Sequence, residues 1–183
     1  ISVSGGSLSS FAASSSTVYT ATFTPSGQGA TTIDVANNKF TDSSGNNNSA
    51  ASQFNWTFDT VVPTMAITSS TVSDGATSND STIALTFTSS KATTNFVVGD
   101  ISVSGGALSS FNASSSTVYT ATFTPSGQGA KTIDVAINKY TDSSGNNNSA
   151  ATQFNWTFDT VVPTMAITSS TVSDGATSND STI

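Results

Sequence analysis

The sequence has no cysteine and no histidine, and its only charged residues are lysine and aspartate. Without histidine, the chain lacks the commonest general acid–base group and metal ligand. Without cysteine, it has no thiol nucleophile, no disulfide and no zinc site built on sulfur. An enzyme would have to work with aspartate, lysine, serine and tyrosine alone, so we expect a protein that is not an enzyme.

Positive charge is also scarce, since four lysines against eleven aspartates give the 183 residues a net charge of −7. So few lysines cannot neutralise a run of phosphates, and we expect no nucleic-acid partner. No apolar run approaches the ~20 residues of a membrane helix, so we expect no membrane span in this segment. A composition rich in Ser, Thr and Asn is typical of disorder, but eleven Phe, three Tyr and two Trp in alternating patterns indicate a folded chain.

The chain repeats itself at an interval of 100 residues. Positions 1–83 and 101–183 differ only at Ser7/Ala107, Ala12/Asn112, Thr31/Lys131, Asn37/Ile137, Phe40/Tyr140 and Ser52/Thr152. A period of this length corresponds to a whole domain per repeat, so we expect tandem domains like beads on a string, not a solenoid.

The segment FDTVVPT, at 58–64 and again at 158–164, sets the boundaries of the repeats. Proline removes a backbone donor and favours an extended residue before it, which suits a short, stiff linker. We predict the C-terminal part of one repeat at 1–59, a complete repeat at 60–159 and the N-terminal strands of the next at 160–183. Because both ends fall inside repeats, we expect the segment to come from a longer array.

Strict alternation of apolar and polar residues predicts seven short strands in one repeat. They span residues 64–69, 81–88, 101–104, 108–113, 118–124, 131–136 and 153–159. The predicted core positions are Ile83, Leu85, Phe87, Tyr119, Ala121, Phe123, Ile133, Val135, Phe154, Trp156 and Phe158. Clusters of Gly, Ser, Asn and Asp separate the strands, and no stretch has helical periodicity. We therefore predict an all-β, immunoglobulin-like, seven-stranded β-sandwich that is held together by apolar packing alone.

The order of these segments resembles a known family. TMAITSS, DGATSNDSTIALTFTSS and TDSSGNNNSAATQFNWTFDTVVPT are similar to the bacterial immunoglobulin-like tandem repeats of giant surface adhesins and biofilm-associated proteins. The resemblance covers the whole chain, and the FD–T–P joint and the DxxGN loop are its most recognisable parts. It implies secretion, tandem extension from a cell surface and calcium at the joints. The family commonly has an acidic residue after the Ser pair of TFTSS, where this chain has Lys91.

The alternating strand directions predict where the aspartates gather. The two poles of a repeat would carry Asp74, Asp80 and Asp159 at one end, and Asp100 and Asp142 at the other. Asp59, from the preceding repeat, would then face Asp100 and Asp142 across the joint. Calcium binds about six to eight oxygen atoms, so these six aspartates are candidate ligands and calcium is the only candidate cofactor. The alternative is that they cap turns through hydrogen bonds to the backbone.

Seven asparagines stand in N-x-S/T sequons, which accept glycans in secreted proteins. They are Asn47, Asn55, Asn79, Asn112, Asn147, Asn155 and Asn179. In a sequence this rich in Ser, Thr and Asn, such sequons also arise by chance.

The leading functional hypothesis is structural: an extracellular extender segment of a fibre, stalk or adhesin, whose partners are neighbouring identical repeats. One alternative is a subunit of a non-covalent filament, completed by strand exchange between copies of the chain. The other is a module that binds surface glycans and needs exposed aromatic residues. Most aromatics alternate into the core, and Phe40, Tyr140 and Phe96, which lie near loops, are the exceptions.

Overall fold

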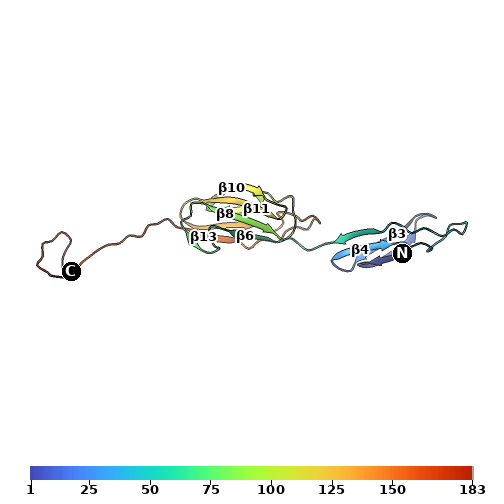
Figure 1. Ribbon diagram of the computed structural model, residues 1–183, viewed down its shortest axis with the longest axis horizontal. Coiled ribbons are helices and arrows are strands. Elements are labelled where there is room, and N and C mark those ends of the chain that lie inside the picture. The colour runs from blue at the N-terminus through green and yellow to red at the C-terminus, as the bar shows by residue number, and fades with distance from the viewer. Residues whose placement is uncertain (183) are drawn as a thin grey trace.

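The computed structural model describes residues 1–182 of the chain. Figure 1 shows two β bodies joined end to end by a short connection, and an extended segment that leads away from the second body. We call strands β1–β5 the first unit, residues 59–64 the joint and strands β6–β13 the second unit. Residue 183, the last of the predicted segment 160–183, lies outside the described residues.

The second unit is a sandwich of two four-stranded sheets, with the strand orders β10-β11-β8-β6 and β7-β13-β12-β9. All its strand pairs are antiparallel except the short parallel pair of β7 and β13. The elements are β6 (Met65–Ser69), β7 (Thr77–Ser78), β8 (Ile83–Ser89), a 3-10 turn (Val98–Asp100), β9 (Ile101–Ser104), β10 (Gly106–Ala113), β11 (Val118–Pro125), β12 (Gly129–Val135) and β13 (Phe154–Phe158).

The predicted all-β sandwich and its seven strands are confirmed in the second unit. Strand β7 is the additional one, because two residues are too few to show alternation. Every predicted core side chain is at most 4% exposed, except Phe158, which packs on the core and is partly buried. Burial of apolar area is the main stabilising contribution, as expected for a sandwich without a disulfide.

Two aromatic residues outside the strands also belong to this core. Phe96 and Tyr140 are 3% and 1% exposed, and their rings meet edge to face with centroids 5.4 Å apart. The interpretation of these two residues as aromatics outside the core is therefore wrong, because Phe96 packs against the core rings of Phe87 and Tyr119, and Tyr140 packs against Phe96. Phe40, the counterpart of Tyr140, is exposed.

The first unit contains the same strands in the same register, without counterparts of β6, β7 and β8. It has a three-stranded sheet, β1-β4-β5, and a two-stranded sheet, β2-β3. These strands are β1 (Ser2–Ser4), β2 (Gly6–Ala13), β3 (Tyr19–Pro25), β4 (Gly29–Asp34) and β5 (Phe54–Phe58). Apolar side chains that β8 covers in the second unit are open here, so Tyr19 is 57% exposed and Tyr119 only 3%.

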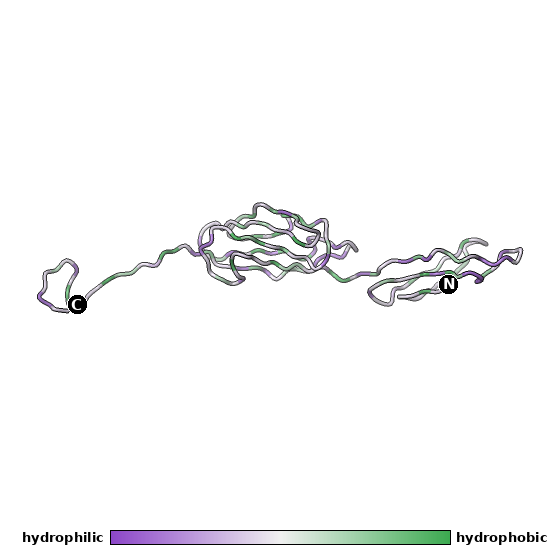
Figure 2. The backbone as a smooth tube through the Cα atoms, in the orientation of Figure 1, coloured by the Kyte–Doolittle hydropathy of each residue, from purple (hydrophilic) through white to green (hydrophobic). Residues whose placement is uncertain are grey.

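Residues 160–182 contain no strand, although their sequence is that of 60–82. Met165 and Ile167 are 90% and 93% exposed, whereas the identical Met65 is buried in β6. In the second unit the strand that pairs with β6 is β8, and residues 160–182 do not include the sequence of β8. Figure 2 shows this segment leaving the second unit as an extended tube and ending in a loop. Within the described chain, no helix has the length and hydropathy to cross a membrane.

Candidate functional site: the joint between the units

The joint connects the end of β5 to the start of β6, and the second unit holds its C-terminal half. Pro63 is buried, and its carbonyl oxygen accepts a hydrogen bond of 3.0 Å from the backbone N–H of Ser149. The backbone N–H of Thr64 donates to the hydroxyl of Ser90 at 2.9 Å, and its carbonyl accepts from the N–H of Ser90 at 2.9 Å. This pair extends the β6–β8 ladder by one step, so the joint enters the second unit already in register.

The first unit holds the other half of the joint through Gln28, which lies in the short connection between β3 and β4, two strands of different sheets. The side-chain carbonyl of Gln28 accepts a hydrogen bond of 2.9 Å from the backbone N–H of Thr60, and its amide group contacts the Thr60 hydroxyl. Gln128 makes the same two contacts to Thr160. Each unit therefore fixes the direction in which the chain leaves it.

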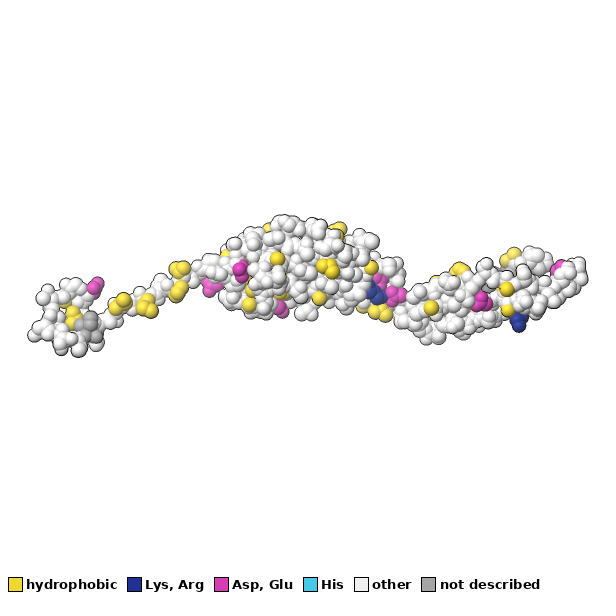
Figure 3. Space-filling model, viewed as in Figure 1, with side chains coloured by type: hydrophobic (Ala, Val, Ile, Leu, Met, Phe, Trp, Pro, Cys, Tyr) yellow, Lys and Arg dark blue, Asp and Glu magenta, His cyan; other side chains and the backbone are white. Residues whose placement is uncertain are grey.

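A lysine at the centre of the joint contacts oxygen atoms of three residues, which come from two segments of the chain. Lys91, in the loop after β8, places its Nζ 2.7 Å from both carboxylate oxygens of Asp59. The same ammonium donates to Oδ2 of Asp142 at 3.0 Å and to the carbonyl oxygen of Val61. Figure 3 shows positively and negatively charged side chains meeting between the two bodies.

The loop that contains Asp142 completes this charged cluster. Oδ1 of Asp142 accepts backbone hydrogen bonds of 2.9 Å from Ser144 and Asn146, and its Oδ2 accepts one of 3.0 Å from the Asn146 amide group. The Asn146 amide group also donates to the carbonyl of Asp59 at 3.1 Å, and the Ser144 hydroxyl contacts Oδ2 of Asp59 at 3.1 Å. The second unit therefore binds Asp59 through both its side chain and its backbone.

The hydrogen bonds keep all three charged groups ionised. Burial alone would raise the pKa of Asp142, but bonds from Asn146, Lys91 and Ser144 outweigh it and lower the pKa to about 2. The hydrogen bond from Lys91 lowers the pKa of Asp59, and the bond to Asp59 raises the pKa of Lys91. The cluster is therefore one positive charge between two negative ones across the ordinary pH range.

Of the three aspartates expected to face one another at this joint, the structure brings two together. Asp59 and Asp142 share Lys91, but Asp100 accepts a hydrogen bond of 2.9 Å from the backbone N–H of Val97 within its own 3-10 turn. Lys91, the partner of both carboxylates, was not among the site residues predicted from the sequence. Its signal was present, as a lysine where the resemblance predicts an acidic residue.

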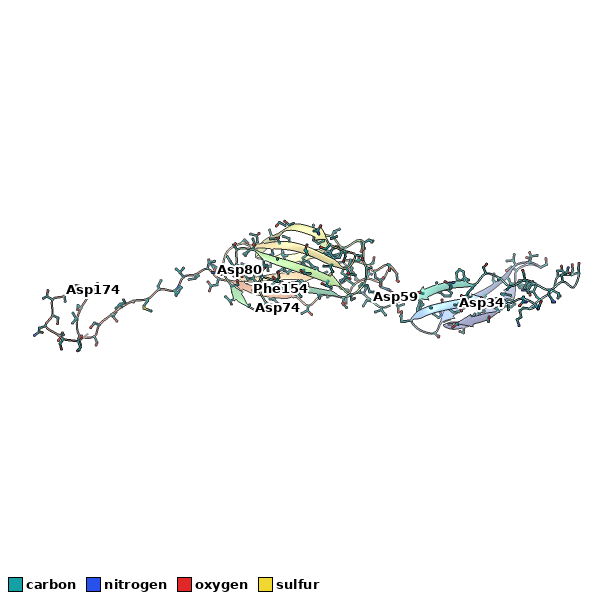
Figure 4. The ribbon with its side chains drawn as sticks, in the orientation of Figure 1. Asp34, Asp59, Asp74, Asp80, Phe154 and Asp174 are labelled. Carbon is teal, nitrogen blue, oxygen red and sulfur yellow. The ribbon has the colours of Figure 1, made fainter. Side chains whose placement is uncertain are left out.

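The aspartates of the opposite pole lie at one end of the unit without converging. Figure 4 places Asp74 and Asp80 at the end away from Asp59. Asp74 accepts a hydrogen bond of 2.6 Å from the backbone N–H of Asn155, and Asp80 pairs with the hydroxyl of Ser78. Asp159 accepts one of 2.8 Å from the N–H of Val161. Across residues 1–182, no three acidic side chains approach closely enough to hold a metal ion together.

The sequons lie mostly on the surface. Exposed asparagines are Asn47, Asn55, Asn79, Asn112, Asn147 and Asn179. Asn155 is half-buried in β13, where its amide group donates to the carbonyl of Gln153 at 3.2 Å. Six of the seven candidate acceptors are thus sterically open to a glycan.

A family model described as the bacterial Ig-like domain matches the chain twice, over residues 1–58 and residues 59–158. No curated protein and no solved structure matches the chain. Together, the two matched ranges cover most of the sequence, and the second contains the sandwich described above. The chain belongs to the bacterial Ig-like domain family.

Proposed function

We propose that the chain is an extender segment of an extracellular fibre, stalk or adhesin, and that it holds successive units in line at a distance from the cell surface. Bacterial Ig-like domains are typically non-enzymatic modules and commonly occur in extracellular or surface proteins. The observation that carries the proposal is the joint, because hydrogen bonds from both flanking units hold it along its length.

A joint that is fixed by both units matters because the distance that a row of domains can span depends on the stiffness of its joints. A flexible linker lets neighbouring domains reorient, so the span of a chain grows only slowly with the number of units. A joint that is fixed at both ends makes span grow in proportion to that number. The near identity of the two copies supports this role, since copying adds length without specialising a unit.

The surface of the second unit offers little to a small ligand. A shallow groove of about 220 Å³ lies between β6 and β13, and its one carboxylate, Asp74, is already bound to the N–H of Asn155. The aromatic residues Phe96 and Tyr140 are inside the core. These features favour the structural role over glycan binding.

Distance measurements between the two units test the proposal. The chain has no cysteine, so Ser43→Cys and Ser73→Cys place two dyes at exposed sites near the outer ends of the two units. We expect a narrow distance distribution by single-molecule energy transfer. A distribution as broad as that of a Gly/Ser-linked pair would contradict a stiff extender. Labelling by antibody on intact producing cells tests the location independently.

A filament completed by strand exchange is the second candidate, and the open edge of the first unit favours it. Strands β3 and β5 have no neighbour on the side where β8 and β7 pair in the second unit. Either an earlier segment of the same repeat or another copy of the chain could supply strands for that edge; residues 160–182 repeat the sequences of β6 and β7, of which that of β7 is the one that could pair directly, with β5. Light scattering after size exclusion separates the two sources, because only exchange between copies gives particles whose mass grows with concentration.

A further inference from the structure

Calcium, the cofactor implied at this joint, does not suit the residues that meet there. Calcium needs about six to eight oxygen atoms around a central position. The oxygen atoms of Asp59, Asp142 and Val61 do converge on one position, and the ammonium of Lys91 lies in it. A cation placed in the same position would contact a positive charge.

The carboxylate oxygens of Asp59 and Asp142 also accept hydrogen bonds from other groups, which leaves them little room to bind a metal ion. Both oxygens of Asp142 accept hydrogen bonds from the Asn146 segment, and Oδ2 in addition accepts the one from Lys91. The carboxylate oxygens of Asp59 accept hydrogen bonds from the Lys91 ammonium, the backbone N–H of Val61 and the hydroxyl of Ser144. The three protons of an ammonium are enough to reach both carboxylates and the carbonyl.

We propose that the Lys91 ammonium is the built-in cation of this joint and couples the two units without a dissolved metal ion. Asp59 follows the last strand of the first unit, while Lys91 and Asp142 come from two loops of the second. The ammonium thus occupies the place where a divalent ion would tie the same segments together. This inference rests on the proposed extender role, since it specifies what stiffens the joint.

Replacing Lys91 with an uncharged residue tests this inference. Lys91→Met keeps much of the apolar stem but removes the charge, and it leaves Asp59 and Asp142 facing each other without a cation. We expect this variant to broaden the distance distribution between dyes at Ser43→Cys and Ser73→Cys, and millimolar calcium to narrow it again. The unsubstituted lysine protein should give the same narrow distribution in calcium and in a chelator.

Controls separate the possible causes. Lys91→Arg keeps a cation at this position and should stay close to the parent distribution, with a smaller shift than Lys91→Met. Asp59→Asn removes one carboxylate and should broaden the distribution in a way that calcium does not reverse. Thermal melting followed by Trp156 fluorescence in a Trp56→Phe background shows whether each variant retains the folded second unit, and only folded variants are compared.

Three outcomes overturn the inference. Calcium could narrow the dye-to-dye distance distribution of the protein with Lys91 intact, the Lys91→Met variant could keep a narrow distribution, or the distribution of Lys91→Met could stay broad in calcium. A lysine protein that is broad under every condition would instead defeat the extender role itself. The failure of the inference and the failure of the proposed function therefore give different results.

Discussion

Residues 1–58 and 101–158 are almost the same sequence in two different surroundings. Their strands pair in the same register, with Leu8 opposite Phe23 in the first unit and Leu108 opposite Phe123 in the second. Yet Phe123 is fully buried, whereas Phe23 remains partly exposed. The difference is the presence of β6 and β8 in the second unit. Strand pairing within residues 1–58 therefore does not depend on β6 and β8, while burial of the inward side chains does.

The hydrogen bonds inside the loops that follow β4 and β12 also form whether or not the loop is buried. Asn48 accepts hydrogen bonds from the backbone N–H groups of Lys39 and Phe40, at 2.7 and 3.1 Å. Asn148 makes the equivalent bonds at 2.7 and 3.0 Å, although it is buried and Asn48 is not. Asx-type bonds within a loop need only the local chain, so the loop forms in both units.

Truncating the paired core phenylalanines should give the largest contrast. Phe123→Ala removes a fully buried ring, and we expect it to lower the free energy of unfolding of the second unit by about 3–5 kcal/mol. Phe23→Ala should cost the first unit clearly less, because its ring is partly solvated already. Denaturation followed by fluorescence reports each unit separately in Trp56→Phe or Trp156→Phe backgrounds. Equal losses would contradict the difference in burial.

Acid should destabilise the second unit by protonating Asp142. Its folded-state pKa, about 2, lies below the ordinary 3.8, so ionisation stabilises the fold above 3.8 and this stabilisation is lost as pH falls toward 2. We expect the melting temperature to fall over that window. Hydrogen bonds from Asn46 also lower the pKa of Asp42, which forms no salt bridge with a lysine within residues 1–182. In NMR titrations, Lys91→Met should raise the pKa of Asp142 and leave that of Asp42 unchanged.

Exchanging the residues at positions 40 and 140 should give a smaller effect. The hydroxyl of Tyr140 lies 3.3 Å from that of Ser89 inside the core. Tyr140→Phe removes this contact, and we expect it to destabilise the second unit by about 0.5–1.5 kcal/mol. Phe40→Tyr adds a hydroxyl to a side chain that is 63% exposed and should change stability very little. A matching loss in both variants, measured by urea denaturation, would argue against the assigned burial.

The smallest expected change in stability comes from the glutamine contacts. Gln28→Ala should alter the free energy of unfolding by less than about 0.5 kcal/mol, as is usual at exposed sites. It should nevertheless broaden the distance distribution between the units, because it frees Thr60 at the joint. Gln128→Ala is the matched control, since it frees Thr160 instead. If both variants broaden the distribution equally, the Gln28 contact does not hold the joint.

The sequence alone predicted most of the fold, but less of the joint. Alternation located seven strands and nearly all core positions, because a strand places successive side chains on opposite faces whatever its neighbours are. It missed β7, and it placed Phe96 and Tyr140 outside the core. The sequence also predicted Asp100 beside Asp59 and Asp142. The order of the strands shows at which end of the unit a loop lies, but it does not show which residues the loop contacts.

The strands, the inward faces and the turns were determined by the sequence itself, because each depends on residues close together in the chain, and the repeat length follows from the near identity of positions 100 residues apart. Only the tertiary structure decided how far the incomplete unit is open, with Tyr19 57% exposed where Tyr119 is 3% exposed. It also decided the partners of Lys91, which lie 32 positions away at Asp59 and 51 positions away at Asp142. Such contacts depend on how distant loops are brought together by packing, and no local pattern records that arrangement.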